Sequence, residues 1–137
     1  MFIDLDGFKQ ANDRFGHDAG DCVLQTVAQR IQQSIRAADT ACRIGGDEFL
    51  LILTEAIDAT SAAVAAQKII ELINQPIDFN RQPLQVGCSI GISLFPDHAS
   101  DSKELRRAAD AAMYQVKRAG KNHYSFASTA EPGFTSA

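Results

Sequence analysis

Two pairs of acidic residues flank short apolar segments of this sequence. Asp4 and Asp6 end the first apolar segment, and Asp47 and Glu48 stand directly before the apolar run Phe49–Leu53. Mg²⁺ prefers oxygen ligands and is often held by one or two carboxylates together with substrate phosphates. Acids that converge from two strand ends therefore predict a site for magnesium and a nucleotide. The alternative is that each pair belongs to an ordinary solvated turn.

Gly45 and Gly46 precede the second acidic pair. Adjacent glycines between the apolar segments Thr40–Ile44 and Phe49–Leu53 are typical of a tight hairpin turn. Because glycine has no side chain, the backbone of such a turn can approach a phosphate group closely. We therefore expect the second acidic pair at the edge of a sheet, beside a turn that is open to a ligand.

Length and composition indicate one globular domain. The 137 residues suffice for a real core, and the hydrophobic fraction of 45% and charged fraction of 22% are ordinary. The net charge of −4 argues against a nucleic-acid partner, which usually requires a basic surface. We expect no membrane segment, because no apolar run approaches about 20 residues. Cys22, Cys42 and Cys88 match no metal-binding spacing, so we expect buried free thiols and a cytoplasmic location.

Apolar periodicity predicts three helices, over Asp18–Ala37, Ala59–Asn74 and Asp101–Ala119. Asp18 is expected to cap the first helix, and Gly120 to end the third. Alternation and β-branched residues predict strands over Thr40–Ile44, Phe49–Leu53, Val86–Leu94 and His123–Phe126.

The strand over Val86–Leu94 should have one bulky and one small face, and Gln75–Pro83 should hold a short edge strand and a turn. Strands mixed with helices, with an antiparallel hairpin at the centre, predict an α+β sheet with helices packed on it.

Several separated clusters of residues stand in a fixed order along the chain: Asp4–Lys9, Asn12-Asp13, Gly16-His17, Gly20-Asp21, Arg43–Phe49, Ser89–Gly91, Ala109-Asp110, Met113-Tyr114, Lys117 and Gly120–Asn122. This ordered set closely resembles the GGDEF family, the diguanylate cyclases that join two GTP molecules into cyclic di-GMP. The resemblance covers residues 1–126 and implies a palm-like fold of the nucleotide-cyclase type, with a mainly antiparallel sheet. Residues 127–137 are small and polar and are expected to form a disordered tail.

The resemblance implies a metal site and a catalytic role for the acids. Asp4, the backbone carbonyl of Leu5, and Asp47 match the family's ligands for Mg²⁺, or Mn²⁺ in its place. Such a metal would neutralise charge on the phosphates and the leaving pyrophosphate. Glu48 is the residue expected to activate the 3′-hydroxyl or to stabilise its deprotonated form. Asp47 is the other residue expected in this catalytic role, because adjacent carboxylates can exchange functions.

The resemblance also implies how GTP would bind. Asn12 and Asp21 match the pair that reads guanine, whose acceptor and donor groups an amide and a carboxylate can satisfy together. The phosphates would lie against the glycine turn and three lysines, so the expected substrate contacts are Gly45, Gly46, Lys9, Lys117 and Lys121. The spacing of Lys117 and Lys121 would place both on one helical face. A solvated basic face is the alternative.

Arg36 and Asp39 stand shortly before the glycine turn, in the Arg-x-x-Asp pattern that the family uses for inhibition by its product. The planar guanidinium suits both a phosphate and the edge of a guanine. The alternative is a salt bridge at a helix end.

The leading hypothesis is an enzyme that acts as a homodimer, with GTP as substrate and cyclic di-GMP as product. The alternative is an inactive GGDEF fragment that binds GTP or cyclic di-GMP as a regulatory module. An adenylyl cyclase is disfavoured by the guanine-type pair Asn12 and Asp21. GGDEF domains normally begin earlier, with an Asp-x-Leu-Thr-Gly-Leu-x-Asn-Arg signature and a long helix, so an N-terminally truncated domain with uncovered apolar sheet surface is expected.

Overall fold

The computed structural model describes residues 1–55 and 58–128. A five-stranded sheet has the order β2-β3-β1-β6-β7, formed by β1 (Phe2–Asp6), β2 (Thr40–Gly45), β3 (Glu48–Ile52), β6 (Gly87–Ile92) and β7 (Tyr124–Phe126). Only β6 and β7 pair in parallel, and the other neighbours are antiparallel. The predicted mainly antiparallel α+β sheet is therefore confirmed. The predicted hairpin, β2–β3, lies at the side of the sheet rather than at its centre, because β1 pairs between β3 and β6.

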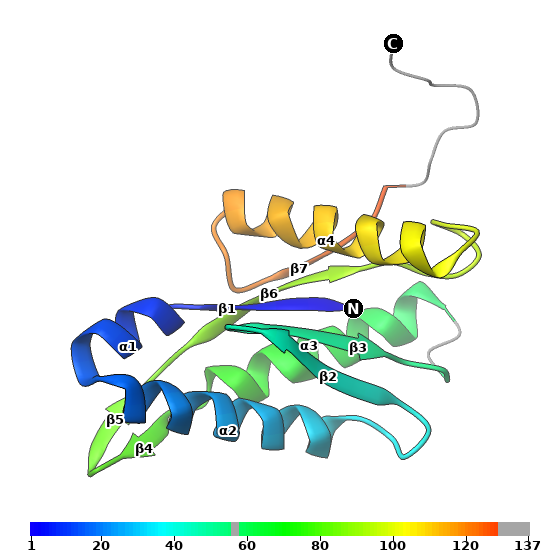
Figure 1. The fold of residues 1–137 in the computed structure, drawn as a ribbon. Coiled ribbons are helices and arrows are strands. Elements are labelled where there is room, and N and C mark those ends of the chain that lie inside the picture. Colours follow the sequence, from blue (N-terminus) through cyan, green and yellow to red (C-terminus); the bar gives the residue numbers. More distant parts are fainter. Residues whose placement is uncertain (56–57, 129–137) are drawn as a thin grey trace.

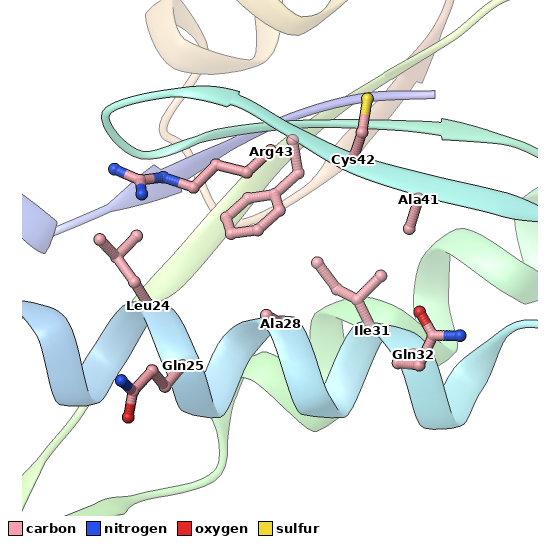
Figure 2. Close-up of a pocket in the computed structure, with 9 residues that line it drawn as sticks. Leu24, Gln25, Ala28, Ile31, Gln32, Ala41, Cys42 and Arg43 are labelled. Atoms are coloured by element: carbon pink, nitrogen blue, oxygen red, sulfur yellow. The ribbon is translucent and has the colours of Figure 1, made fainter.

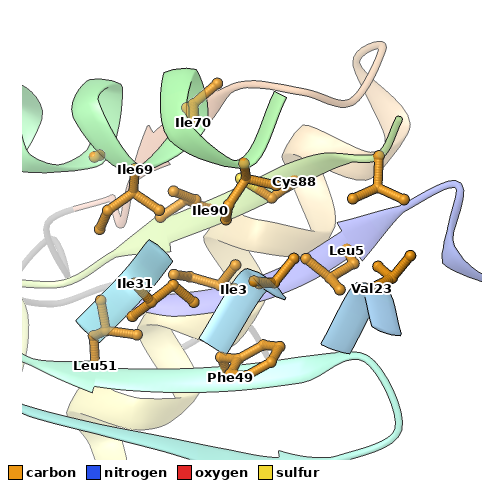
Figure 3. Packing of buried hydrophobic residues seen from close by; sticks show 14 of the residues in the cluster. Ile3, Leu5, Val23, Ile31, Phe49, Leu51, Ile69, Ile70, Cys88 and Ile90 are labelled. Atoms are coloured by element: carbon orange, nitrogen blue, oxygen red, sulfur yellow. The ribbon is translucent and has the colours of Figure 1, made fainter. Parts of the chain in front are cut away.

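Helices cover both faces of the sheet (Figure 1). α2 (His17–Ser34) and α3 (Ala59–Asn74) lie on one face, and α4 (Ser102–Arg118) lies on the other. Alternation along β1 explains this division, since successive side chains of a strand point to opposite faces. Ile3 and Leu5 are buried among residues of α2 and α3 (Figure 3). Phe2 packs instead with Ala109 and Met113 of α4. Asp4 and Asp6 consequently lie on the α4 face.

The small face of β6 allows α4 to lie directly on the sheet. A Cβ atom on Gly91 would lie 1.8 Å from the carbonyl oxygen of Ala109 and 2.4 Å from the backbone nitrogen of Met113. The opposite face carries Cys88, Ile90 and Ile92, which are buried in the main core. The predicted strand with one bulky and one small face is confirmed, and its small face sets how closely α4 approaches the site.

The helices begin largely where their capping residues predict. Asp58 accepts a hydrogen bond from Ser61 N at 2.7 Å at the start of α3, and Asp101 accepts one from Glu104 N at 2.8 Å at the start of α4. The expected cap of α2 is wrong. Gly16, with φ 92°, precedes α2 and provides no side-chain cap, and Asp18 lies inside the first turn.

The structure also contains elements that the sequence did not predict correctly. α1 (Phe8–Phe15) was not predicted, because eight residues are too short for a clear helical period. β4 (Ile77–Phe79) and β5 (Gln82–Leu84) pair with each other across Asn80 and Arg81, both at positive φ. They form a separate two-stranded sheet, where the sequence predicted one edge strand and a turn.

Cys42 corrects a further expectation. Cys88 is buried and Cys22 is half-buried, but Cys42 is exposed on the edge strand β2. All three are free thiols, as expected. Of the helices that the structure describes, none has the length and apolarity to cross a membrane. The expected tail falls mostly on residues 129–137, outside the described part of the chain.

Candidate active site

The acids of β1 and of the glycine turn meet on the α4 face of the sheet. Asp4 stands opposite Glu48 of β3 and opposite Ser89 of β6 in the strand register. The backbone amide of Leu5 donates to the carbonyl oxygen of Asp47 at 3.1 Å, which ties the turn to β1. The structure therefore brings together the two acidic pairs that stand more than forty residues apart in the sequence.

The electrostatics of Asp4 reflect this crowding. Burial raises the pKa of its carboxyl from 3.8 to about 6, and the nearby charge of Asp47 acts in the same direction. Lys117 opposes the increase, and Glu48 contributes a smaller further rise in this pKa. A site in which acids repel one another in this way gains from a bound cation.

Lys117 already provides one cationic group at these oxygens. Its Nζ lies 2.6 Å from Asp6 Oδ1, 3.3 Å from Asp4 Oδ1 and 3.3 Å from the carbonyl oxygen of Leu5. Burial lowers the pKa of Lys117, but its hydrogen bond to Asp6 and the charges of Asp4 and Asp6 outweigh this and raise it. Lys117 is therefore held as an ammonium ion.

Asp6 differs from Asp4 in having a full set of donors. Ser89 Oγ donates to both of its carboxylate oxygens, at 2.9 and 3.0 Å, and the backbone nitrogen of Asn122 donates at 2.9 Å. Asp6 thus ties the loop after α4 to β1 and β6. The sequence pattern included Ser89 and Asn122 without assigning them a role, since nothing in their spacing indicates a shared partner.

The chemistry of the donor set fits a hard divalent cation such as Mg²⁺. Asp4 and Asp47 offer carboxylates, Leu5 offers a carbonyl, and the Asp4 and Leu5 oxygens already converge on an ammonium group. In residues 1–55 and 58–128, no cluster of three or more His, Cys, Asp or Glu side chains is arranged to hold a metal ion. A metal at this position therefore needs the main-chain oxygen of Leu5 or oxygens from a ligand.

The glycine turn leaves open space beside the acids. A Cβ atom on Gly45 or Gly46 would meet nothing within 4 Å, and Gly46 has φ 52°, a conformation that favours glycine. Arg43 Nε donates to the carbonyl oxygen of Gly46 at 2.9 Å and braces the turn. The space beside both glycines is therefore open.

The two residues expected to read guanine come from adjoining helices. Asn12 lies on α1 and Asp21 on α2, and a Cβ atom on Gly20 would lie 2.4 Å from Asn12 Oδ1. The amide of Asn12 therefore rests against the residue next to Asp21. Asn12 Nδ2 also lies 3.4 Å from His17 Nδ1. Lys9 is exposed on the first turn of α1.

Lys121 does not share a helical face with Lys117, so that expectation is wrong. α4 ends at Arg118, and the chain turns through Gly120 at φ 122° and Lys121 at φ 66°. The backbone nitrogen of Lys121 donates to the carbonyl oxygen of Val116 at 2.9 Å, which closes the helix end. Lys121 is exposed in the following loop.

Arg36 and Asp39 lie in the turn between α2 and β2, and their side chains have separate partners. The Arg36 guanidinium pairs with Glu55, which raises the pKa of Arg36. Asp39 accepts hydrogen bonds from the backbone nitrogens of Arg36 and Thr54, each at 3.0 Å. Arg36 thus forms an ion pair just past the end of α2, in line with the alternative of a helix-end salt bridge, and its partner is Glu55 rather than Asp39. A hollow of about 410 Å³ is lined by Arg36, Asp39, Glu55 and Lys68, among others.

A second cavity, of about 270 Å³, lies between α2 and β2 (Figure 2). Its lining is mostly apolar, with Leu24 and Ile31 facing Ala41 and Phe49. It includes none of the residues predicted to bind the metal or GTP. The acids and Lys117 lie on the opposite face of the sheet.

Comparisons with known proteins show the family of the chain. The family model for the diguanylate cyclase GGDEF domain matches residues 1–123. MucR of Pseudomonas aeruginosa, a bifunctional diguanylate cyclase/cyclic di-GMP phosphodiesterase, is 46% identical over 92% of this chain and 18% of that protein.

Two solved GGDEF domains have the same fold. That of TpbB (YfiN) from P. aeruginosa has a TM-score of 0.90 and 39% identity, covering 93% of this chain and 74% of that one. That of DgcB from Caulobacter crescentus, in complex with c-di-GMP, has a TM-score of 0.81 and 27% identity, covering 91% and 74%. The chain spans less than a third of the length of curated relatives such as MucR (18%) and TpbB (31%). With its acids, glycine turn and sheet in the arrangement described, the chain belongs to the GGDEF family of diguanylate cyclase domains.

Proposed function

We propose that this domain binds GTP with Mg²⁺ or Mn²⁺ and, as a homodimer, condenses two GTP molecules into cyclic di-GMP and pyrophosphate. The observation that carries the proposal is the convergence of Asp4, the Leu5 carbonyl and the Asp47 turn beside a half-buried lysine. This is an oxygen-rich, partly desolvated site next to a turn with space for phosphates.

Asp4, Leu5 and Asp47 would hold the metal, which when bound neutralises charge on the phosphates. Glu48, opposite Asp4 in the register, would accept the proton of the 3′-hydroxyl. The 3′-oxygen then forms a bond to the α-phosphorus of the other GTP, whose bond to pyrophosphate breaks. Lys117 would contact the phosphates. Lys9 follows the acids of β1 in the sequence, and Lys121 follows Lys117. Both lysines are exposed, and both are expected to contact the phosphates.

Asn12 and Asp21 would select guanine over adenine. An amide oxygen or carboxylate accepts from the N1 and N2 donors of guanine, and an amide nitrogen donates to O6. Adenine offers the opposite pattern at the corresponding positions. The contact of Asn12 with Gly20 supports this assignment, because it holds the amide beside Asp21.

A homodimer is expected because each copy of the domain has binding groups for a single GTP. Each copy has one guanine-reading pair and one set of acids, so each would bind one GTP. The two phosphodiester bonds of the product would then form between two facing copies. The specific activity should therefore rise with protein concentration.

Substitution of Asp47 tests the proposal. Asp47→Asn should lower formation of cyclic di-GMP from GTP and Mg²⁺ by about 100-fold or more, because several kcal/mol of charge stabilisation are lost. Product is measured by chromatography over a range of protein concentrations. Asp97→Asn, which changes an exposed acid outside the site, is the matched control and should keep wild-type turnover. If Asp47→Asn turned over GTP normally, Asp47 would not belong to the metal site.

The second candidate function is a module that holds cyclic di-GMP without turnover. It is favoured by the hollow beside Arg36 and by the similar DgcB domain, which was solved in complex with c-di-GMP. Such a module would bind cyclic di-GMP in calorimetry, yet form no product at any protein concentration.

A further inference from the structure

Lys117 occupies an unusual position for a residue expected to bind phosphate. Its ammonium contacts Asp4 Oδ1 and the carbonyl oxygen of Leu5, both at 3.3 Å. These are two of the three groups that the proposed metal would need. The side chain is 22% exposed, so most of its surface is covered by the protein.

Asp6 and Asp4 depend on Lys117 to different extents for hydrogen bonds and charge neutralisation. Asp6 keeps the hydroxyl of Ser89 and the backbone nitrogen of Asn122 as donors without the lysine. Asp4 has Lys117 as its cationic partner, and no other ion pair of Asp4 occurs among the described residues. Removing the ammonium would therefore leave Asp6 satisfied and free the oxygens of Asp4 and Leu5.

An ammonium and a divalent cation cannot comfortably share these oxygens. Two positive charges at hydrogen-bond distance from the same oxygen atoms repel each other strongly in a partly desolvated site. Lysine has a flexible stem of four carbons and rotatable donors, so its ammonium can move to another oxygen partner. The phosphates of a nucleotide would be such a partner.

We propose that Lys117 is an internal cation that competes with the metal for Asp4 and the Leu5 carbonyl, and that nucleotide phosphates draw it away. This inference rests on the proposed metal and GTP site. It makes metal and nucleotide binding mutually reinforcing: the metal binds weakly alone, and the phosphates favour it by engaging the lysine. The domain would thus avoid holding a metal ion without its substrate.

Lys117→Met tests the inference, because methionine keeps an unbranched stem and lacks the charge. Binding of Mn²⁺ without nucleotide is measured by electron paramagnetic resonance. It should become about tenfold tighter, in line with the loss of one charged hydrogen-bonding competitor. Binding of GTP in the presence of EDTA should become about tenfold weaker, since a phosphate contact is lost. Opposite changes in the two affinities are the expected signature.

Arg118→Met is the matched control. It removes a positive charge from the adjacent residue, whose guanidinium lies over the ring of Tyr114 at 5.3 Å rather than beside the acids. Its Mn²⁺ affinity should stay within about twofold of wild type, because an exposed charge is screened. Equal gains in both variants would reduce the effect to overall charge and overturn the inference. Unchanged or weaker Mn²⁺ binding by Lys117→Met would overturn it too.

A measurement on the wild-type chain makes the test independent of any variant. The chain has five lysines, so the side-chain Nζ and Cε resonances of Lys117 can be followed during titration with Mg²⁺. Displacement of the ammonium should shift these resonances and speed exchange of its protons with water. Resonances that do not respond while Mg²⁺ binds would overturn the inference.

Failure of the underlying metal site is separately recognisable. Asp4→Asn and Asp47→Asn should each weaken Mn²⁺ binding if the proposed site exists. A Mn²⁺ affinity that neither substitution changes would contradict both the proposed site and the inference. Binding that responds to both acids but not to Lys117 would overturn the inference alone.

Discussion

Opposing electrostatic effects act on the carboxyl group of Asp4. Burial and the neighbouring acid Asp47 disfavour its charged form, while Lys117 favours it, and the net result is a pKa of about 6. Its neighbour in sequence, Leu5, is buried and hydrogen-bonded to the glycine turn. The fold therefore holds an acid in a position that is costly without a cation.

The raised pKa of Asp4 predicts how stability depends on pH. The folded chain keeps the proton up to about pH 6, whereas the unfolded chain releases it near its ordinary value of 3.8. The free energy of unfolding should therefore decrease as the pH rises from about 4 to 6. Asp4→Asn should remove this slope and stabilise the protein at pH 6 by on the order of 1 kcal/mol, after allowance for solvent screening.

Chemical denaturation of both proteins at several pH values checks this prediction. The comparison should not extend above pH 6, because burial lowers the pKa of the Met1 amino group to about 6 and its titration would add a second pH dependence at higher pH. Parallel pH profiles for wild type and Asp4→Asn would show that Asp4 titrates normally in the folded chain.

At the scale of elements, close packing at glycines positions both parts of the site. α4 rests on Gly91 of β6, and this contact brings Lys117 to the acids of β1. α1 approaches α2 at Gly20, where the amide of Asn12 fills the space that a side chain would occupy. Gly91 thus supports the region proposed to bind metal and phosphate, and Gly20 supports the region proposed to bind guanine.

Alanine at these two glycines should have different consequences. In Gly91→Ala the new Cβ meets backbone atoms of α4, which cannot move independently, so a loss of about 3 kcal/mol or more in stability is expected. In Gly20→Ala it meets the end of the Asn12 side chain, which can rotate away. That variant should remain folded and bind GTP more weakly by about tenfold, through one lost guanine hydrogen bond.

Thermal unfolding and GTP calorimetry of the two variants separate these outcomes. Gly45→Ala is a suitable control for stability, since its Cβ would meet nothing within 4 Å. Wild-type GTP affinity in a folded Gly20→Ala would argue that Asn12 does not read the base.

At the scale of the whole molecule, the β2–β3 hairpin links two separate regions. The glycine turn and its acids lie at one end, and the Arg36–Asp39 turn lies at the other, where Asp39 holds the backbone of Thr54. The five residues of β3 place these ends about 17 Å apart. A ligand at the Arg36 end would therefore leave the acids free.

Product binding at the Arg36 end gives the prediction at this scale. If cyclic di-GMP binds there, Arg36→Ala should weaken it by about tenfold or more, because a charge-assisted contact is lost. Glu55→Gln should strengthen it a few-fold, because the Glu55 carboxylate now pairs with the guanidinium that the phosphate would need. GTP binding should be unaffected in both variants.

Calorimetry with cyclic di-GMP, on proteins that also carry Asp47→Asn, prevents turnover from complicating the measurement. Glu71→Gln, on the exposed side of α3, is the matched control for Glu55→Gln. An unchanged affinity in Arg36→Ala would limit Arg36 to its ion pair with Glu55.

Local sequence determined the elements with the strongest periodicity. The apolar stripe of α3, the hairpin across Gly45 and Gly46, and the small face of β6 all followed from residue type and spacing, because burial selects side chains by face. The ordered motifs were sufficient for the family, and the expected site residues Asp4, Asp47, Glu48 and Lys117 do lie in one region.

Tertiary structure alone decided which groups touch. Asp6 accepts four hydrogen bonds from three residues, Lys117, Ser89 and Asn122. Arg36 pairs with Glu55, and Lys121 lies beyond the end of α4. No spacing in the sequence encodes these contacts. Such contacts depend on how strands align and how closely α4 approaches Gly91. Those distances are set by packing across the sheet, between residues that can be far apart in the sequence, such as Asp6 and Ser89, which are 83 positions apart.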